Sequence, residues 1–232
     1  QSGLATWKYA IYSGKIKNVV KTLGKAGYRT GIIGKLHINP KSAFPFDFKA
    51  IPSANFSRKN MASYVENAAK CIKHSDKPFY LQVNYPDAHR PFIKTIDKLP
   101  AKPITGKDVD AIPYMGINHP ELRQQTADYY NCMMRLDSYI GDLLKALKGS
   151  GKAANTVVVY IGDHGADLLR GKRTSYEGGV RIPMIIRWPG TKGGQVRKEL
   201  VSTLDRFPTF CEIAEVRVPK SLPGRSLKPI VH

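Results

Sequence analysis

The stretch Val157-Val-Val-Tyr-Ile-Gly-Asp-His-Gly165 carries the most information about this chain, because an apolar run ends there in an acid and an imidazole. A basic, glycine-rich segment follows, Arg170-Gly-Lys-Arg-Thr-Ser-Tyr-Glu-Gly-Gly179. In open α/β sheets, ligands bind beyond the carboxyl ends of the strands. Asp-His-Gly alone is typical of an ordinary strand end with a solvated turn. Together with Lys172, which can hold an anion, it indicates a hydrolase site for a charged oxyanion ester.

Strands and helices alternate on both sides of this stretch. Short apolar or β-branched runs predict strands, helical spacing of apolar residues predicts helices, and Ser57 is the expected cap of one helix. The predicted strands are 28–34, 79–85, 156–161 and 184–188; the predicted helices are 15–25, 57–74, 120–147 and 203–215; and 35–55 and 86–118 are irregular. Alternation of this kind predicts an α/β fold with a largely parallel sheet and helices on both faces.

Polar residues that could carry chemistry follow three of the predicted strands. They are Lys35 and His37 after the first, Asp87, His89 and Arg90 after the second, and Asp163, His164 and Lys172 after the third. If these strands are parallel neighbours, all three groups meet on one rim of the sheet. The alternative is three unrelated polar turns.

Composition and charge limit the class of protein. The chain has 232 residues, 42% of them hydrophobic, which suits one large globular domain. Its net charge of +19 indicates an anionic partner or a basic surface. The lysines and arginines are scattered and no nucleic-acid-binding motif accompanies them, so an anionic polysaccharide suits the charge equally well. No apolar run is long enough to span a bilayer.

The cysteines predict no disulfide framework. Cys71, Cys132 and Cys211 lie far apart, show no metal-ligand spacing and fall in helical patterns. We therefore expect all three to be core residues.

Long motifs resemble the sulfatase family of the alkaline-phosphatase superfamily, and they occur in the family's order over nearly the whole chain. The motifs are Gly27–His37, Asn84–Pro91, Gly162–Gly165, Arg170–Pro183, Trp188–Gly190 and Ser202–Thr209. Within the family, Phe44-Pro-Phe-Asp-Phe48 and Asp87-Ala-His-Arg90 resemble the heparan N-sulfatases and related bacterial polysaccharide sulfatases. The resemblance implies an alkaline-phosphatase-like fold, of which this chain would be part.

The resemblance also implies catalytic roles. Lys35 would bind the nucleophile's oxygen or the sulfate, and His37 would be the base that helps to release sulfate. His89 would protonate the leaving group or contact a sulfate oxygen, and Lys172 would hold the sulfate from the other side.

Substrate contacts are implied for Asp87 and Arg90. Asp87 would meet the amine side of an amino sugar, and Arg90 would meet a substrate anion. From the residues alone, Asp87 could equally cap the loop, and Arg90 could be paired on the surface.

Asp163 and His164 would be metal ligands by the same resemblance. The family's usual divalent ion is calcium, which prefers oxygen donors. An imidazole suits transition metals better, so His164 leaves the identity of the metal open.

The family's nucleophile is a formylglycine made from Cys or Ser in a motif Cys/Ser-x-Pro/Ala-x-Arg. None of the three cysteines stands in such a motif, so we expect the formylglycine upstream of Gln1. Residues 1–218 would then be the central part of the catalytic domain, and 219–232 the start of a connection to a C-terminal subdomain. We expect this stretch to be inactive by itself.

The full-length parent is expected to hydrolyse sulfuric esters or sulfamates on sulfated, heparan-sulfate-like glycans by formylglycine-dependent sulfuryl transfer. The resemblance implies a periplasmic or secreted protein, lysosomal in a eukaryote. A phosphodiesterase or phosphonate monoester hydrolase of the same superfamily is one alternative, and a non-catalytic binder of anionic glycans is another. Charge alone would also suit nucleic acid, which is not an expected partner because no motif supports it.

Overall fold

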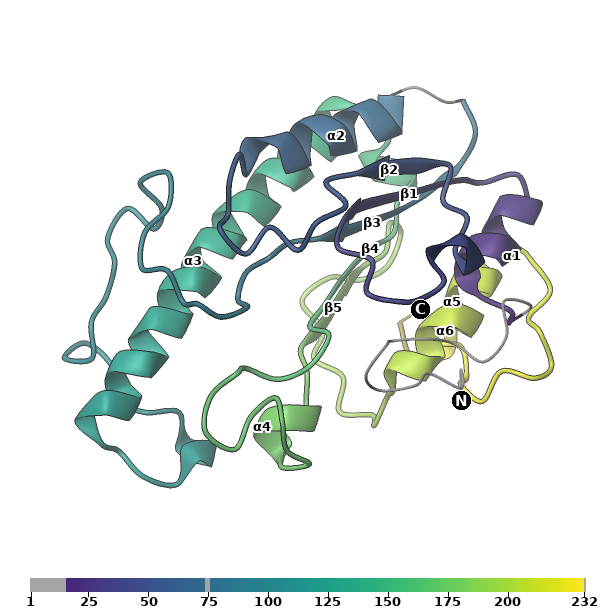
Figure 1. Ribbon diagram of the computed structural model, residues 1–232. Helices are drawn as coiled ribbons and strands as arrows, with labels where there is room; N and C mark the ends of the chain where they lie inside the picture. Colours follow the sequence, from purple (N-terminus) through teal and green to yellow (C-terminus); the bar gives the residue numbers. More distant parts are fainter. Residues whose placement is uncertain (1–15, 74–75, 232) are drawn as a thin grey trace. The chain divides into compact units, whose positions relative to one another are not determined.

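The computed structural model describes residues 16–73 and 76–231 (Figure 1). Their contacts divide them into two compact units. The sheet unit comprises residues 16–53, 67–84 and 187–231, and the long-helix unit comprises residues 54–66 and 85–186. Each unit is described by itself.

The sheet unit is built on three parallel strands in the order β2-β1-β3. They are β1 (Arg29–Gly34), β2 (Phe48–Ala50) and β3 (Phe79–Asn84). β1 and β3 pair in register along their whole length, from Arg29 opposite Phe79 to Gly34 opposite Asn84. The strands predicted at 28–34 and 79–85 are therefore confirmed as parallel neighbours.

Helices cover both faces of this sheet. Consecutive strand residues point to opposite faces. Ile32 packs with Val20 of α1 (Val19–Lys25), whereas a Cβ at Gly31 would lie 2.8 Å from Cys71 Sγ of α2 (Ala62–Lys73). Tyr80 of β3 contacts Phe210 of α5 (Arg206–Ile213), with ring centroids 5.7 Å apart, and α5 also packs against α1 (Figure 1). This arrangement confirms the predicted α/β class.

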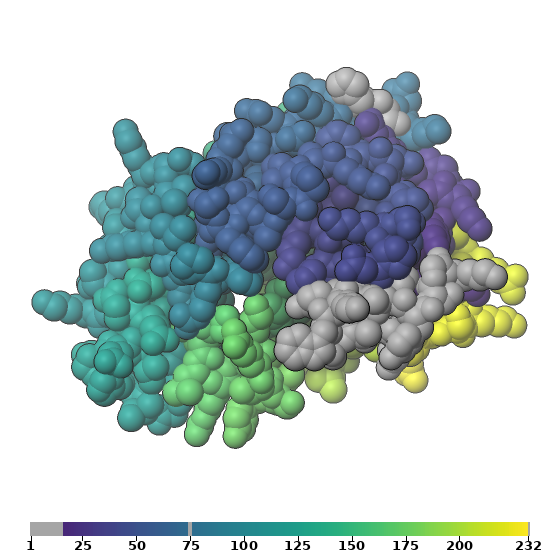
Figure 2. Space-filling model, viewed as in Figure 1, coloured from purple at the N-terminus to yellow at the C-terminus, as the bar shows by residue number. Residues whose placement is uncertain are grey.

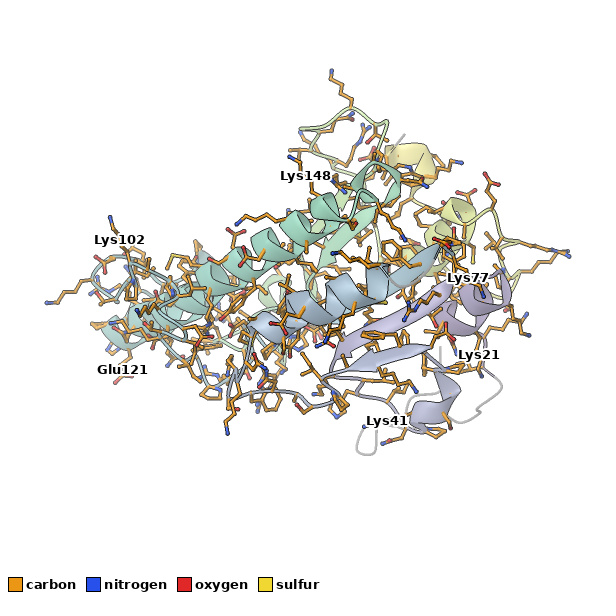
Figure 3. The ribbon with its side chains drawn as sticks, turned by 90° about the horizontal axis from the view of Figure 1, so that it is seen from above. Lys21, Lys41, Lys77, Lys102, Glu121 and Lys148 are labelled. Carbon is orange, nitrogen blue, oxygen red and sulfur yellow. The ribbon has the colours of Figure 1, made fainter. Side chains whose placement is uncertain are left out.

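The long-helix unit is dominated by α3 (Pro120–Gly149). His119 caps its N-terminus, Glu121 lies in its first turn and Lys148 in its last (Figure 3). These charges complement the helix dipole, which favours an acid at the start and a base at the end. The helix predicted at 120–147 is confirmed.

Two short strands, β4 (Val158–Ile161) and β5 (Met184–Arg187), pair with each other as a separate two-stranded sheet. Between them runs the segment of residues 162–181, which contains α4 (Glu177–Val180) and appears in green on the surface in Figure 2. Leu168 anchors it in a buried cluster with Ala111 and with Met115 of η2 (Pro113–Met115). This packing fixes the segment onto the chain that precedes α3.

The sequence-based prediction differs from the structure most clearly at the start of α2 and in the segment 35–55. The helix expected from Ser57 begins at Ala62, because Arg58 and Asn60 adopt left-handed backbone conformations, with φ of 52° and 49°. The segment 35–55, expected to be irregular, contains η1 (Lys41–Ala43) and the three-residue β2. A strand this short carries too little alternation to be recognised.

Short elements complete the fold. They are η3 (Ala153–Asn155), η4 (Thr203–Asp205), which starts the region predicted as helix 203–215, and α6 (Lys228–Val231). All three cysteines are free and buried, as predicted. In the described part of the chain, every helix is too short or too polar to cross a membrane.

Candidate active site

The carboxyl ends of β1 and β3 meet closely at Gly34. This residue has φ of +92°, and a Cβ there would lie 2.2 Å from the carbonyl oxygen of Asn84. The side-chain Nδ2 of Asn84 donates to the carbonyl oxygen of Lys35 at 2.8 Å. The main chain of Lys35 is therefore held in place directly after the end of β1.

His37 follows two residues later and is exposed. Partial burial and the nearby positive charge of Lys35 lower the pKa of His37 below its ordinary value. A lowered pKa increases the neutral fraction of the imidazole near pH 7, and the neutral form is the one that accepts a proton.

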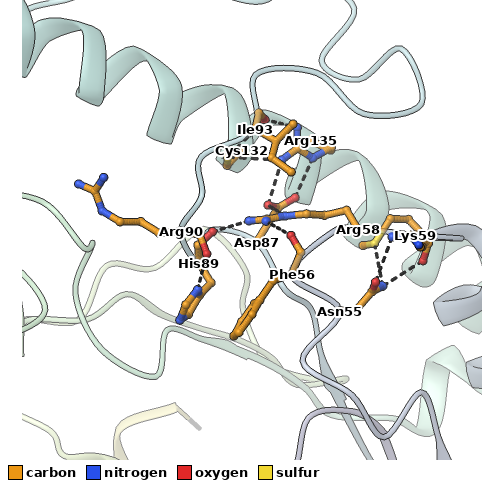
Figure 4. Close-up of polar contacts among 11 residues, drawn as sticks. Asn55, Phe56, Arg58, Lys59, Asp87, His89, Arg90, Ile93, Cys132 and Arg135 are labelled. Carbon is orange, nitrogen blue, oxygen red and sulfur yellow. Dashed lines mark hydrogen bonds and ion pairs between the residues drawn. The ribbon is translucent and has the colours of Figure 1, made fainter.

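His89 in the long-helix unit is held through a ring nitrogen, the face of its ring and its main-chain nitrogen; Figure 4 shows the ring beside Arg90 and Phe56. Its Nδ1 lies 2.6 Å from the carbonyl oxygen of Arg90, so the ring donates there from a protonated Nδ1. The ring stacks on Phe56 with centroids 4.0 Å apart, and its main-chain nitrogen donates to the carbonyl oxygen of Pro86. Nε2 is the ring nitrogen left for chemistry.

Asp87 is placed differently from the prediction. Its side chain is 0% exposed and forms ion pairs with Arg58 at 3.0 Å and Arg135 at 2.8 Å. The carboxylate is buried between two guanidinium groups, so it is not accessible to the amine side of an amino sugar. The predicted substrate contact is therefore replaced by a role in holding the loop that carries His89.

Arg90 joins the segment after β3 to the segment after β4. Its Nε donates to the carbonyl oxygen of Asp167 at 2.9 Å, and its guanidinium lies over the ring of Phe92. The side chain is 44% exposed, so part of it faces solvent. Two of the three polar groups expected from the sequence are thus linked within one unit, and contact between Arg90 and a substrate anion remains a prediction.

Glycines shape the segment that carries Lys172. Gly165 donates its N–H to the carbonyl oxygen of Gly179 at 3.0 Å, and Lys172 donates its N–H to that of Ala166 at 2.8 Å. A Cβ at Gly165 would lie 1.8 Å from the Gly178 carbonyl oxygen, and one at Gly171 would lie 2.0 Å from that of Ala166. Only glycine permits these approaches, so the segment is folded tightly against itself.

Asp163 and His164 place two potential metal-ligating atoms close to each other. Asp163 Oδ2 lies 3.4 Å from His164 Nε2, and His164 Nδ1 donates to the carbonyl oxygen of Gly165 at 2.8 Å. A metal-binding histidine commonly donates its other ring N–H to a carbonyl, which leaves Nε2 for the ion. The pair fits two ligands of one metal ion. No group of three or more candidate ligands occurs among the described residues.

His164 also lines an open cavity of about 380 Å³ in the long-helix unit. Tyr114 and Tyr129 contribute aromatic surface, and burial raises the pKa of Tyr129 to about 12, so its hydroxyl stays protonated. Glu177 and Arg181 also line the cavity and pair with each other at 3.7 Å. Such a mixture of aromatic and charged groups suits a polar ligand.

The predicted residues are divided between the two units. Lys35 and His37 belong to the sheet unit, whereas His89, Arg90, Asp163, His164 and Lys172 belong to the long-helix unit. The sequence-based expectation that all three strands are neighbours is not met among the described residues, because β4 pairs with β5 and not with β1 or β3. The meeting of all these residues on one rim stays a prediction.

A serine, in addition to the three cysteines, could be considered for the formylglycine position. Ser221-Leu-Pro-Gly-Arg225 matches the letters of the formylglycine motif. The preceding element is the helix α5, and the segment is tied to η4, because Asp205 accepts from the main-chain nitrogen of Arg225 at 2.8 Å. A Cβ at Gly224 would lie 2.2 Å from the Leu204 carbonyl oxygen. These contacts explain why residue 224 is a glycine, because the packing leaves no room for a side chain there.

Comparisons with known proteins agree with the motifs. The chain is 28% identical over 252 residues to human (Homo sapiens) N-sulphoglucosamine sulphohydrolase, which covers 94% of this chain and 50% of that protein. It is 25% identical to an ulvan-active sulfatase of Formosa agariphila, which covers 100% of this chain and 47% of the relative. The chain thus spans about half the length of these relatives.

A solved structure shares the fold. It is the protein BT4656 in complex with its substrate D-glucosamine-2-N,6-O-disulfate, with a TM-score of 0.75 and 22% identity over 97% of this chain and 66% of that one. The family model named Sulfatase matches residues 12–216. The chain therefore belongs to the sulfatase family.

Proposed function

We propose that the full-length gene product hydrolyses sulfuric esters or sulfamates of heparan-sulfate-like glycans by formylglycine-dependent sulfuryl transfer. The observation that carries this proposal is the fixed ring of His89, whose Nδ1 is committed to the Arg90 carbonyl oxygen. Nε2 is then the nitrogen that meets the substrate. A ring held in one orientation suits a group that must deliver a proton to one atom.

In this proposal His89, as the imidazolium, donates its Nε2 proton to the oxygen or nitrogen that leaves with the sugar. Lys172 and Lys35 stabilise the negative charge that grows on the sulfuryl oxygens. His37 accepts the proton whose removal releases sulfate, a role that its lowered pKa favours.

Asp163 and His164 would hold a divalent metal ion, which supplies positive charge beside the reacting oxyanion when it is bound. The family resemblance favours calcium. Arg90 is left to contact a substrate anion through the exposed part of its guanidinium.

The substrate class rests on two likenesses and on the cavity beside His164. One relative is named for N-sulfated glucosamine, and one structural neighbour has D-glucosamine-2-N,6-O-disulfate as its substrate. Tyr114 and Tyr129 offer aromatic surface, and Arg181, which also pairs with Glu177 at 3.7 Å, offers N–H donors of the kind that a sulfated sugar can use. The net charge of +19 favours encounter with a polyanion. The family resemblance favours activity in the periplasm, outside the cell or in a lysosome.

The test is substrate cleavage by the full-length gene product, with the released sulfate or phenylphosphonate measured by ion chromatography. The substrates are N-sulfoglucosamine, glucosamine-6-sulfate, 4-nitrophenyl sulfate and 4-nitrophenyl phenylphosphonate. We expect the sulfated substrates to be cleaved and the phosphonate to be a poor substrate. His89→Ala should lower kcat/KM about 100-fold or more, since general acid catalysis contributes about 10²–10⁴-fold.

His119→Ala is the matched control, because His119 lies in the same unit as an exposed helix cap. It should leave kcat/KM within about twofold of the unsubstituted protein, as expected for a surface change away from the site. Preferential cleavage of the phosphonate, or equal losses in the two histidine variants, would reject the proposal.

A further inference from the structure

Arg58 is a fully buried arginine that contacts the main chain of His89 and two residues beside it, Phe56 and Asp87. Its exposed fraction is 1%, and its Nε donates to Asp87 Oδ1 at 3.0 Å. Its Nη2 donates to the main-chain carbonyl oxygen of His89, and its Nη1 to that of Phe56, whose ring stacks on the imidazole (Figure 4). One side chain thus reaches the main chain of His89 and the residue beneath its ring.

The local backbone is shaped to deliver this side chain. Asn55 Oδ1 accepts from the Lys59 main-chain N–H at 3.0 Å, and Asn55 Nδ2 donates to the Lys59 carbonyl oxygen at 3.0 Å. This closed turn contains Arg58 in a left-handed conformation, with φ of 52°. The turn delays the start of α2 and directs the guanidinium inward.

Binding one carboxylate and two carbonyl oxygens at once requires an arginine side chain. Its guanidinium is planar and presents five N–H donors in fixed directions, whereas the lysine ammonium is a compact point charge. Arg58 uses separate donors for a carboxylate and two carbonyl oxygens. Arg135 also binds Asp87, but its remaining main-chain contact is with the Ile93 carbonyl oxygen at 2.8 Å and not with His89. The two arginines share a carboxylate and differ in what else they hold.

We infer that Arg58 is the positioning residue for His89, fixing the imidazole through its main-chain carbonyl and through the stacked Phe56 ring. This inference rests on the proposed role of His89 as proton donor to the leaving group. A proton donor displaced by a fraction of an ångström loses most when the leaving group is a poor one, because such a group most needs the proton.

The experiment compares two aryl sulfates in the full-length gene product, 4-nitrophenyl sulfate with a good leaving group and 4-methoxyphenyl sulfate with a poor one. Arg58→Lys, Arg58→Met and Phe56→Leu are measured beside the matched control Arg135→Met. Arg58→Lys and Phe56→Leu test the idea even if Arg58→Met does not fold, because Phe56 lies partly at the surface, 37% exposed. Unfolded protein lowers both rates by the same factor, so their ratio reports only on the site.

The Arg58 variants should lower kcat/KM for the poor leaving group about tenfold more than for the good one, a part of the full general-acid effect. Phe56→Leu should shift the ratio in the same direction, and Arg135→Met, which removes contacts to Asp87 and Ile93 but none to His89, should shift it clearly less than the Arg58 variants do. Equal losses on both substrates in the Arg58 and Phe56 variants, while His89→Ala shows the selective loss, would overturn the positioning role alone. If His89→Ala itself shows no selectivity, the proposed function fails as well.

Discussion

Arg135 donates two hydrogen bonds to Asp87, from Nε to Oδ2 at 2.8 Å and from Nη2 to Oδ1 at 3.0 Å. Both side chains are 0% exposed. Burial alone would lower the pKa of Arg135, but the hydrogen bonds and charge of Asp87 outweigh it and raise that pKa. With Arg58 on its other side, the carboxylate lies between two guanidinium groups. The chain after β3 is therefore anchored through one acid.

Asp87→Asn should destabilise the fold strongly. It leaves two buried arginines without a counter-charge, and breaking a buried ion pair in this way costs about 3–5 kcal/mol. The measurement is the free energy of unfolding from urea titration. Asp142→Asn is the control, because it removes only an exposed pair with Lys145 (2.9 Å) and should cost less than about 1 kcal/mol. Similar losses in the two variants would contradict the structural role of Asp87.

The ion pairs of Asp87 with Arg58 and Arg135 could not be predicted from the sequence, although much of the fold could. The strands around Ile32 and Val83 and the long helix could be predicted, because apolar spacing is a local property. The pairing of Asp87 with Arg58, 29 residues away, depends on tertiary contacts, so the sequence predicted only a substrate contact or a loop cap for Asp87. Ser57 looked like a helix cap for the same reason, since nothing local shows that Arg58 must turn inward.

The second prediction concerns the glycine-rich segment. Gly165→Ala should cost about 1–3 kcal/mol, as overpacking does, because the new Cβ would meet the Gly178 main-chain oxygen at 1.8 Å. Hydrogen exchange of residues 162–181 should become faster, since the hydrogen bond to Gly179 is strained. Gly193→Ala is the control, because nothing lies within 4 Å of a Cβ there. Unchanged exchange in the Gly165 variant would show that the segment can relax.

The third prediction concerns the titration of His37. Its pKa is lowered first by partial burial and then by the charge of Lys35. NMR titration should give a midpoint below 6.5, and Lys35→Gln should raise that midpoint without restoring it fully. The unfolded chain then binds more protons between the two pKa values. The contribution of His37 to stability is therefore complete above the unfolded pKa and is lost as pH falls through the folded one. A midpoint at or above 6.5 would be inconsistent with this environment.

The last prediction concerns the metal ligands. The imidazole of His164 is a poor partner for calcium and a better one for manganese, whereas an amide oxygen suits calcium. His164→Asn should therefore shift the ratio of the two affinities towards calcium, and Asp163→Ala should weaken both metals. The measurement is isothermal titration calorimetry of the full-length gene product after removal of metal with a chelator. His119→Asn should leave both affinities unchanged, because His119 only caps α3. An unchanged ratio in His164→Asn would show that His164 does not contact the ion, even though its Nε2 lies 3.4 Å from Asp163 Oδ2.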